Sequence, residues 1–356
     1  MSRALDRDTA STIHSGNPQA VYDDLVRALN PDTSTSTPTD LLEIEILGKS
    51  HALPAGCNVL VDGTSIAVPK VTLVQAFMVA RKVLFQHLPN IQSKQQTTRN
   101  AAAVMLLMDP EHVTAANSRK RAVQTYRAQP AEFRTELARE RWWVDSMLTA
   151  RLHRHTKSPT LWGHRRWVLE MWQKLEMPYD IHEDLVCVVL VAAERHKCNY
   201  YAWLHLRWLV QRRMGGCQLG GEATEAEAEA VACDGSKVLS TVKSWCLRHP
   251  GDTAGFSFLL FCLLEHPHAG VVLTGGASRA EVKSSVCKDV LDLAVSFKWT
   301  NESVWAFLRT LVASGVAEEQ RTAFFESITV LSEARPGNAK GLSTLQAARD
   351  WCMGYE

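Results

Sequence analysis

A cluster of cationic side chains is the first candidate for chemistry in this chain of 356 residues. No acidic residue lies between Asp145 and Glu170, whereas the segment contains several basic ones: Arg151, His153, Arg154, His155, Lys157, His164, Arg165 and Arg166. Such a cluster could face an anion, because fixed cationic groups stabilise the negative charge that grows on a leaving group. It could also be structural, with Arg165 and Arg166 tying helices together and the His-Arg-His run forming a solvated, basic helix C-terminus.

Other catalytic arrangements are missing from the sequence. It contains no G-x-S-x-G, H-E-x-x-H or G-x-G-x-x-G pattern and no phosphate-binding loop. Its nine cysteines include no C-x-x-C pair, and no pair of histidines complements them, so we expect no structural zinc site and no cofactor bound by this chain. Their odd number and scattered positions favour buried, reduced thiols in a cytoplasmic protein.

The charge balance argues against two broad classes of function. The chain has 39 Lys and Arg against 38 Asp and Glu, which gives a net charge of +1. This balance does not favour a general nucleic-acid coat or a membrane-surface binder driven by bulk charge. Hydrophobic residues make up 46% of the chain, so a sizeable core is available. We expect any electrostatic function to come from local clusters.

No targeting or membrane-spanning segment is predicted. The first 17 residues are polar and of mixed charge, unlike a signal peptide, and the longest apolar stretch is 185–193. That stretch is about half of the roughly 20 residues needed to cross a bilayer. Cys352 is fifth from the end, whereas a C-terminal prenylation box requires a cysteine at the fourth position from the end. We therefore expect no direct membrane insertion and no C-terminal prenylation of this chain itself.

The composition divides the chain into three parts. Residues 1–40 are rich in Ser, Thr, Asp and Pro and are predicted to be flexible. Residues 41–70 are predicted to be a short irregular lead-in, with a short helix followed by an extended segment and a turn. From residue 71 to 356 apolar residues recur at three- and four-residue steps, which predicts helical hairpins. A Gly-rich acidic segment near 215–235 interrupts this pattern and is interpreted as a surface insertion.

Two segments align without gaps, with aromatic and basic residues at the same offsets. Residues 158–167 and 199–208 each place a Trp, a His two residues later, an Arg four later and a second Trp five later. A third copy keeps Trp305 and Arg309. Steps of 46, 41, 53 and 49 residues, each long enough for two helices and their turns, separate the anchor positions Ala116, Trp162, Trp203, Phe256 and Trp305.

The spacing within each copy has a physical reason. Trp162 and Arg166 are four residues apart, as are Trp203 and Arg207, so each pair lies on one face of a helix. A large ring at the seam between hairpins buries about 150–250 Å², and the Arg can bond carbonyls or carboxylates of a neighbouring hairpin. One hairpin cannot bury its apolar face alone. We therefore predict an all-α fold, a right-handed and crescent-shaped α-α superhelix of stacked hairpins.

The Asn-Tyr-x-x-Trp-x-x-x-Arg signature resembles the repeat of protein prenyltransferase α subunits. The match is carried by residues 157–169 and by the copy that begins at Asn199, and it covers most of residues 55–335. The chain departs from the repeat at Leu206 and Leu308, where the family has Arg. The resemblance implies a structural role for Trp162, Arg165, Arg166, Trp167, Asn199, Tyr200, Trp203, Arg207, Trp208, Trp305 and Arg309.

This resemblance also implies a function. It implies an α-type subunit of a heterodimeric protein geranylgeranyltransferase that is inactive without its β subunit. The β subunit would hold zinc and the isoprenoid pocket, and geranylgeranyl diphosphate would be the co-substrate. In similar enzymes a Lys five residues before the repeat Trp reaches the diphosphate, and Lys157 matches that position. Tyr201 matches a position near the same site where relatives often place a His.

The resemblance extends to partners. It implies pairing with the prenyltransferase β subunit that also serves Rab proteins, over a large interface lined by the repeat helices. It implies protein acceptors with a C-terminal Cys, including SNARE-type proteins that already carry one lipid. The alternative is a non-catalytic adaptor, a helical-repeat scaffold of the tetratricopeptide kind. The tetratricopeptide period of about 34 residues fits the observed steps poorly.

Overall fold

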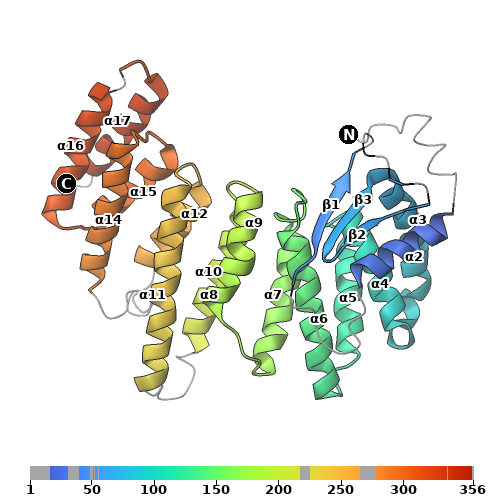
Figure 1. The fold of residues 1–356 in the computed structure, drawn as a ribbon. Coiled ribbons are helices and arrows are strands. Elements are labelled where there is room, and N and C mark those ends of the chain that lie inside the picture. Colours follow the sequence, from blue (N-terminus) through green and yellow to red (C-terminus); the bar gives the residue numbers. More distant parts are fainter. Residues whose placement is uncertain are drawn as a thin grey trace. The chain divides into compact units, whose positions relative to one another are not determined.

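The computed structural model of the protein describes residues 17–30, 40–48, 51, 53–54, 56–216, 225–264, 278–334 and 336–354. By its contacts the chain divides into two compact units, an N-terminal unit of residues 1–179 and 190–196 and a C-terminal unit of residues 180–189 and 197–356. Figure 1 labels the helices and strands of the chain. Helices dominate the described residues of both units, so the prediction of an all-α helical-repeat fold is confirmed. The handedness and the crescent shape stay predictions.

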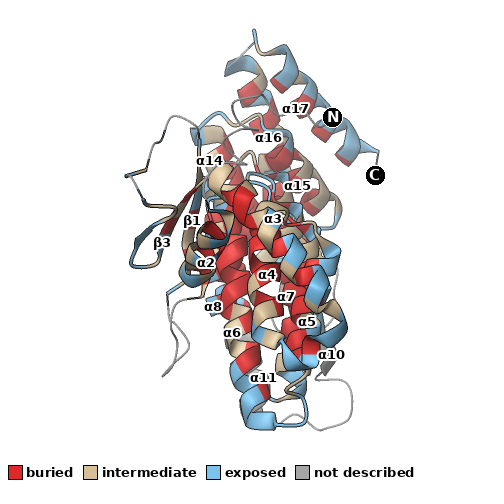
Figure 2. Ribbon diagram, turned by 90° about the vertical axis from the view of Figure 1, so that its right-hand side faces the viewer, coloured by how far each residue is buried: buried red, intermediate tan, exposed pale blue. Residues whose placement is uncertain are grey.

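The N-terminal unit combines helical hairpins with a small sheet. Helix α4 packs on α3 and α5, and α6 packs on α7. Many residues of α4, α6 and α7 are buried (Figure 2), and most of these are apolar. The elements of this unit are α2 (Pro18–Leu29), β1 (Glu43–Leu47), β2 (Leu60–Asp62), β3 (Ser65–Pro69), α3 (Lys70–His87), the 3₁₀ turn η1 (Leu88–Ser93), α4 (Gln95–Met108), α5 (Val113–Gln124), α6 (Pro130–Thr149), α7 (Pro159–Lys174) and α9 (Leu190–Arg195).

The predicted short helix after residue 40 is wrong, because these residues form strand β1. Polar and β-branched residues alternate over Glu43–Leu47, which is the two-residue period of a strand with one buried face. β1 pairs in parallel with β3, and β2 pairs with β3 in antiparallel orientation, so the strand order is β1-β3-β2. The inner face buries Ile44 and Ile66. Ser146 of α6 anchors the sheet by accepting a bond of 3.0 Å from the backbone N–H of Leu42.

The predicted flexible segment 1–40 is wrong for Pro18–Leu29, which is helix α2. Asn17 caps this helix by accepting a bond from the backbone N–H of Ala20 at 3.2 Å. Val21, Leu25 and Leu29 recur every four residues and are buried, and the helix packs on α3. The composition averaged over residues 1–40 is polar and conceals the apolar stripe of α2. Composition alone therefore does not predict this helix.

A buried ionic network joins α4, α5, α6 and α7. The carboxylate of Glu140 is fully buried and accepts bonds from Nε and Nη2 of Arg119 at 2.8 and 2.9 Å. His164 Nε2 lies 2.8 Å from the same carboxylate, and Arg99 Nη2 lies 3.5 Å from it. The guanidinium of Arg119 also stacks on Trp143, with Cζ 3.5 Å from the ring centroid. Four helices therefore converge on one carboxylate.

Protonation of this network follows from its burial. Burial alone would raise the pKa of Glu140, but the charge of Arg119, the hydrogen bond from His164 and the charge of Arg99 outweigh it and hold that pKa well below its usual range. Burial lowers the pKa of His164 more strongly than Glu140 raises it, so this imidazole stays neutral near pH 7. The stable pairing is therefore an ionised Glu140 with a charged Arg119.

The C-terminal unit consists of helices. Successive helices pack on one another, as α11 on α12, α14 on α15 and α16 on α17, in the hairpin arrangement that the sequence predicts. The elements are α8 (Ile181–Asp184), the π-helical turn η2 (Leu185–Val189), α10 (Tyr200–Gly216), α11 (Glu225–Arg248), α12 (Thr253–Leu264), α14 (Arg279–Ser296), α15 (Glu302–Ala313), α16 (Glu318–Ala334) and α17 (Ala339–Met353).

The structure bears on two predictions from the sequence, the acidic insertion and the extent of the repeat domain. The Gly-rich part of the expected insertion near 215–235 lies largely outside the described residues, and the Ala/Glu-rich part begins helix α11 at Glu225. The repeat domain expected over 71–356 is distributed over both compact units, and the N-terminal one also includes the sheet and α2.

An aromatic cluster fills the space between α10, α11 and α12. The ring of Trp203 lies edge-on to Trp245, with centroids 5.0 Å apart, and 5.5 Å from Phe258. A Cβ atom on Gly255 would meet Trp245 at 2.6 Å and Trp203 at 3.2 Å. Only the missing side chain of Gly255 allows these rings to approach α12 so closely.

Glu140→Gln tests the ionic network. We expect the free energy of unfolding to fall by about 3–5 kcal/mol at neutral pH, because Arg119 is left buried without a full counter-charge. The contribution of Glu140 is fully present above its unfolded pKa of about 4.3 and is lost as the pH falls towards its folded pKa. Urea unfolding monitored by tryptophan fluorescence measures both effects. The exposed Glu326→Gln should change the free energy by less than about 0.5 kcal/mol.

Gly255→Ala tests the aromatic cluster. We expect it to lower the free energy of unfolding by about 1–3 kcal/mol, because the new methyl group overlaps Trp245. Gly163→Ala in α7 is the matched control, since no atom lies within 4 Å of the added Cβ. That control should raise stability by about 0.5–1 kcal/mol through helix propensity. Equal effects of the two changes in thermal and urea unfolding would contradict this packing.

Candidate functional site

A polar residue starts the second helix of each hairpin, and the anchor position follows four residues later. The anchors of five copies, Ala116, Trp162, Trp203, Phe256 and Trp305, are all buried. A sixth copy, which the sequence reasoning missed, starts α17 at Asn338, 37 residues after Asn301. In the sequence this copy is marked only by the Asn at its cap, because no aromatic residue follows at the anchor position. The six residues before these helices are His112, Ser158, Asn199, Asp252, Asn301 and Asn338.

Several of these caps also join one hairpin to the next within a unit. The hydroxyl of Ser158 accepts from the backbone N–H of Leu161 at 3.1 Å and donates to the carbonyl of Pro110 at 3.1 Å. Asp252 accepts from the backbone N–H of Gly255 with one oxygen and from that of Cys198 with the other, both at 2.8 Å. One side chain thus begins a helix and fixes the preceding hairpin against it.

The anchor tryptophans occupy equivalent positions in their repeats, but their indole N–H groups do not all form the same hydrogen bond. Trp162 donates to the carbonyl of Thr156 at 2.9 Å, and Trp305 donates to the carbonyl of Trp299 at 2.8 Å, in both cases six residues earlier. The indole N–H of Trp203 finds no acceptor among the residues that the structure describes. This ring is held instead by the aromatic cluster of the C-terminal unit.

The repeat arginines contact protein groups of their own unit. Arg165 is fully buried and donates from Nε to Asp145 at 2.6 Å. Arg207 lies over the ring of Phe261 at 4.4 Å, and Arg309 lies over Trp351 at 4.8 Å. The half-buried Arg166 follows Arg165 in α7. These contacts favour the structural reading of the arginines.

The remaining repeat residues lie on the same helices. Trp167 packs half-buried against the core around Val168 and also contacts the ring of His164. Trp208 packs on His205 and beneath Arg212. Asn199 is buried and caps α10, whereas the neighbouring Tyr200 is 60% exposed.

The two residues predicted to face the diphosphate belong to different units. Lys157 is half-buried in the loop before α7, in the N-terminal unit. Tyr201 lies half-buried in the first turn of α10, in the C-terminal unit, with its ring 5.6 Å from that of Tyr200. That both reach one diphosphate stays a prediction.

The loop around Lys157 is cationic, but its arginines are already paired. Arg154 lies 3.1 Å from Asp109, and Glu43 of β1 pairs with both Arg195 at 2.6 Å and Arg151 at 3.9 Å. Lys157 forms no ion pair with a carboxylate in the part of the chain that the structure describes. Its ammonium group is therefore available to an external anion.

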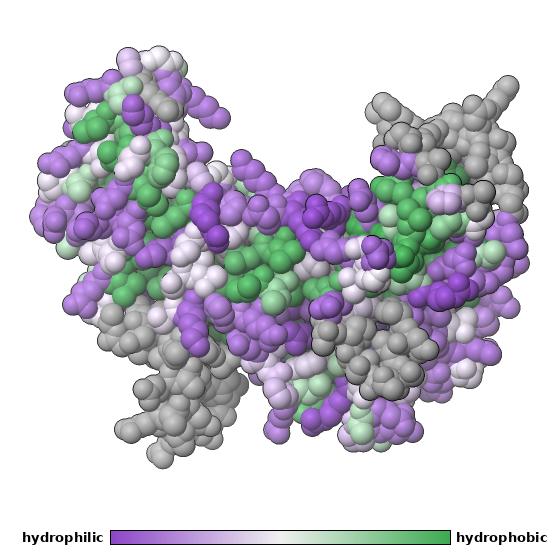
Figure 3. Space-filling model, viewed as in Figure 1, coloured by the Kyte–Doolittle hydropathy of each residue, from purple (hydrophilic) through white to green (hydrophobic). Residues whose placement is uncertain are grey.

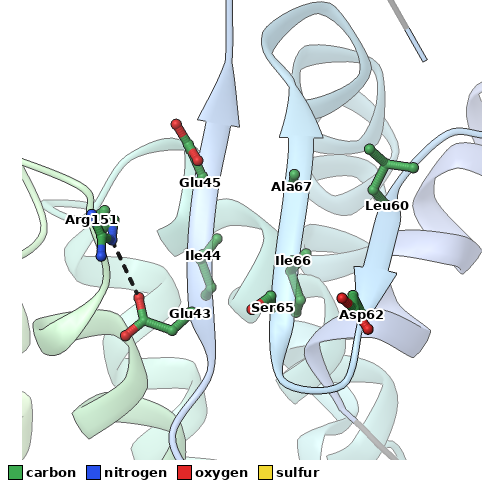
Figure 4. Close-up of a pocket in the computed structure, with 9 residues that line it drawn as sticks. All are labelled: Glu43, Ile44, Glu45, Leu60, Asp62, Ser65, Ile66, Ala67 and Arg151. Atoms are coloured by element: carbon green, nitrogen blue, oxygen red, sulfur yellow. Dashed lines mark ion pairs between the residues drawn. The ribbon is translucent and has the colours of Figure 1, made fainter. Parts of the chain in front are cut away.

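A second surface feature, which the sequence did not indicate, lies on the outer face of the sheet. A pocket of about 430 Å³ is lined by nine residues, among them Glu43, Glu45, Asp62, Ser65 and Arg151 (Figure 4). Apolar side chains gather over the sheet in the space-filling view (Figure 3), and Leu60, which lines the pocket, is exposed there. This pocket arises because the central strand β3 presents small residues between the longer side chains of β1 and β2.

The part of the chain that the structure describes contains neither a candidate metal site nor a helix that could span a membrane. Among the described residues, no group of three or more His, Cys, Asp or Glu side chains is arranged to hold a metal ion. Within the same residues, every helix is too short or too polar to span a bilayer.

Comparisons with known proteins agree with this geometry. The family model "Protein prenyltransferase alpha subunit repeat" matches residues 183–213, which include the cap and anchor of α10. The chain is 28% identical over 183 residues to "Protein prenyltransferase alpha subunit repeat-containing protein 1-A" of Xenopus laevis, covering 46% of this chain and 36% of that protein. A Danio rerio relative, "Protein prenyltransferase alpha subunit repeat-containing protein 1", is 28% identical over 193 residues, 47% of this chain and 38% of its own.

A human protein of the same name is 24% identical over 182 residues, which are 46% of this chain and 39% of the relative. The match thus spans less than two fifths of the length of these relatives. The resemblance predicted from the sequence is confirmed: residues 183–213 match the protein prenyltransferase alpha subunit repeat, and the chain is similar to proteins named for that repeat.

Proposed function

We propose that this chain is the α-type subunit of a heterodimeric protein geranylgeranyltransferase. The observation that supports it most directly is Lys157, a half-buried lysine without a carboxylate partner among the described residues, five positions before a buried repeat Trp. The repeat match and the names of the relatives support the same assignment. A β subunit, of the kind shared with Rab geranylgeranyltransferase, would complete the enzyme.

The proposed reaction joins a protein thiol to an isoprenoid. A zinc ion in the β subunit would favour the thiolate of the acceptor Cys. The thiolate sulfur attacks the first carbon of geranylgeranyl diphosphate, a carbon–sulfur bond forms, and the bond from that carbon to the diphosphate oxygen breaks. Negative charge grows on the departing diphosphate, so a fixed ammonium at Lys157 stabilises the transition state more than the ground state. Acceptors would include SNARE-type proteins that already carry a lipid.

Co-expression with a prenyltransferase β subunit tests the assignment. We expect stable co-purification and transfer of labelled geranylgeranyl diphosphate to a protein ending in Cys, with neither chain active alone. Binding without transfer would contradict the enzyme assignment and would favour a non-catalytic adaptor. Absence of any complex with the candidate β subunits would count against both the heterodimer and its interface.

Lys157→Ala tests the role of the ammonium group. We expect kcat of the heterodimer to fall about 10- to 100-fold, because part of the charge that stabilises the leaving group is lost, while the complex stays intact. Lys157→Arg should retain part of the rate. The exposed Lys174→Ala at the end of α7 is the matched control and should leave kcat unchanged. Wild-type turnover of Lys157→Ala would remove this residue from the site.

A further inference from the structure

Two histidines contact each other close to Lys157, and neither belongs to the repeat motif. His153 lies in the same loop as Lys157 and is exposed, while His196 follows the C-terminus of α9 and is half-buried. Their rings meet edge to face, with centroids 4.1 Å apart and planes inclined by 77°. The Nδ1 atom of His196 is buried and has no hydrogen-bond partner among the described residues. All three residues belong to the N-terminal unit.

The surrounding charges leave this group without a counter-ion. From the loop, Arg151 and Arg154 are paired with Glu43 and Asp109, and from α9, Arg195 is paired with Glu43. Glu194 of α9 is exposed. No carboxylate in the described part of the chain forms an ion pair with His153, Lys157 or His196. Three groups that carry or can carry positive charge therefore lie close together, and within the described ranges no carboxylate is paired with them.

We propose that His153 and His196 complete, with Lys157, a proton-coupled site for a diphosphate group, so that binding of the anion draws a proton onto the imidazole of His196. This inference rests on the proposed function, because it takes the diphosphate of the isoprenoid donor as the natural ligand. Two imidazolium rings in edge contact repel each other when the site is empty. A bound diphosphate supplies the negative charge that both rings need, and it can accept a hydrogen bond from each.

The direction of the pH dependence follows from this geometry. In the empty site, burial first, then the charges of His153 and Lys157, lower the pKa of His196, so its imidazole is neutral near pH 7. An adjacent anion favours the charged form and raises that pKa. Affinity is therefore highest below the pKa of the empty site and falls as the pH rises through the pKa of the bound site. The site would release diphosphate more readily in alkaline solution.

Calorimetric titration of the full-length chain with inorganic pyrophosphate tests the proposal. The ratio of dissociation constants at about pH 8 and about pH 6 should be about tenfold larger for wild type than for His196→Gln. The ionisation of pyrophosphate itself is the same in both titrations and cancels in this comparison. Titrations at one pH in buffers of different ionisation enthalpy should show fewer protons taken up by the variant.

Three further variants make the result specific. His153→Gln alters an exposed side chain, so the fold is kept, and it should weaken pyrophosphate binding, because an imidazole that can donate a hydrogen bond to the anion is lost. His196→Lys should bind pyrophosphate with less pH dependence than wild type. His87→Gln, at the end of α3 in the same unit, should show the same ratio of dissociation constants and the same proton uptake as wild type.

An equal ratio of the dissociation constants at the two pH values for wild type and His196→Gln would overturn the proposal, as would absence of pyrophosphate binding by the wild-type chain. Proton-coupled binding in a chain that supports no transfer with any β subunit would defeat only the proposed function. Transfer by a heterodimer whose pyrophosphate affinity is independent of these histidines would defeat only this inference.

Discussion

The caps of the second helices hold the repeats together, since several of them bond in two directions. Ser158 and Asp252 each satisfy a backbone group in the first turn of their own helix and a backbone group of the preceding hairpin. The free N–H groups at a helix start must find partners, and here one polar side chain meets that need while it fixes the position of the next repeat. The distance between caps varies from 37 to 53 residues, yet the anchor always follows its cap by four. Loops and first helices can therefore change length without disturbing the seam.

Charge pairing inside the N-terminal unit explains why so basic a loop has only a few groups left for a ligand. Glu140 and Asp145, both on α6, bind Arg119 and Arg165 in the interior, where an unpaired guanidinium would be costly. Glu43 and Asp109 pair with exposed arginines of the loop and of α9. Lys157, His153 and His196 are the groups of this cluster that form no ion pair with a carboxylate among the described residues. A ligand attracted to this surface would thus meet a small, defined group of cations rather than a diffuse positive patch.

Much of the repeat region could be predicted from sequence, because its pattern is local. The Trp and Arg of α7 and α10 recur at fixed offsets within a single helix turn, and such offsets survive any change in tertiary context. Strand β1 was misread because a short apolar segment suits either a helix or a strand, and pairing with β3, about 20 residues further on, decides it. The copy at Asn338 has Leu342 at its anchor position, so neither an aromatic ring nor a Trp–Arg pair marks it in the sequence.

By itself, the sequence determined the helical-hairpin period, the cap-to-anchor spacing and the cationic character of the segment before α7. All three depend on residues close together in the chain. Only the tertiary structure decided which cations are buried in ion pairs, since Arg119 and Arg165 meet carboxylates 21 and 20 residues away, across helix interfaces. The tertiary structure also brings His196 into contact with His153, 43 residues earlier in the chain, and close to Lys157. Electrostatic energy depends on distance in space and on exclusion of water, and the folded packing sets both.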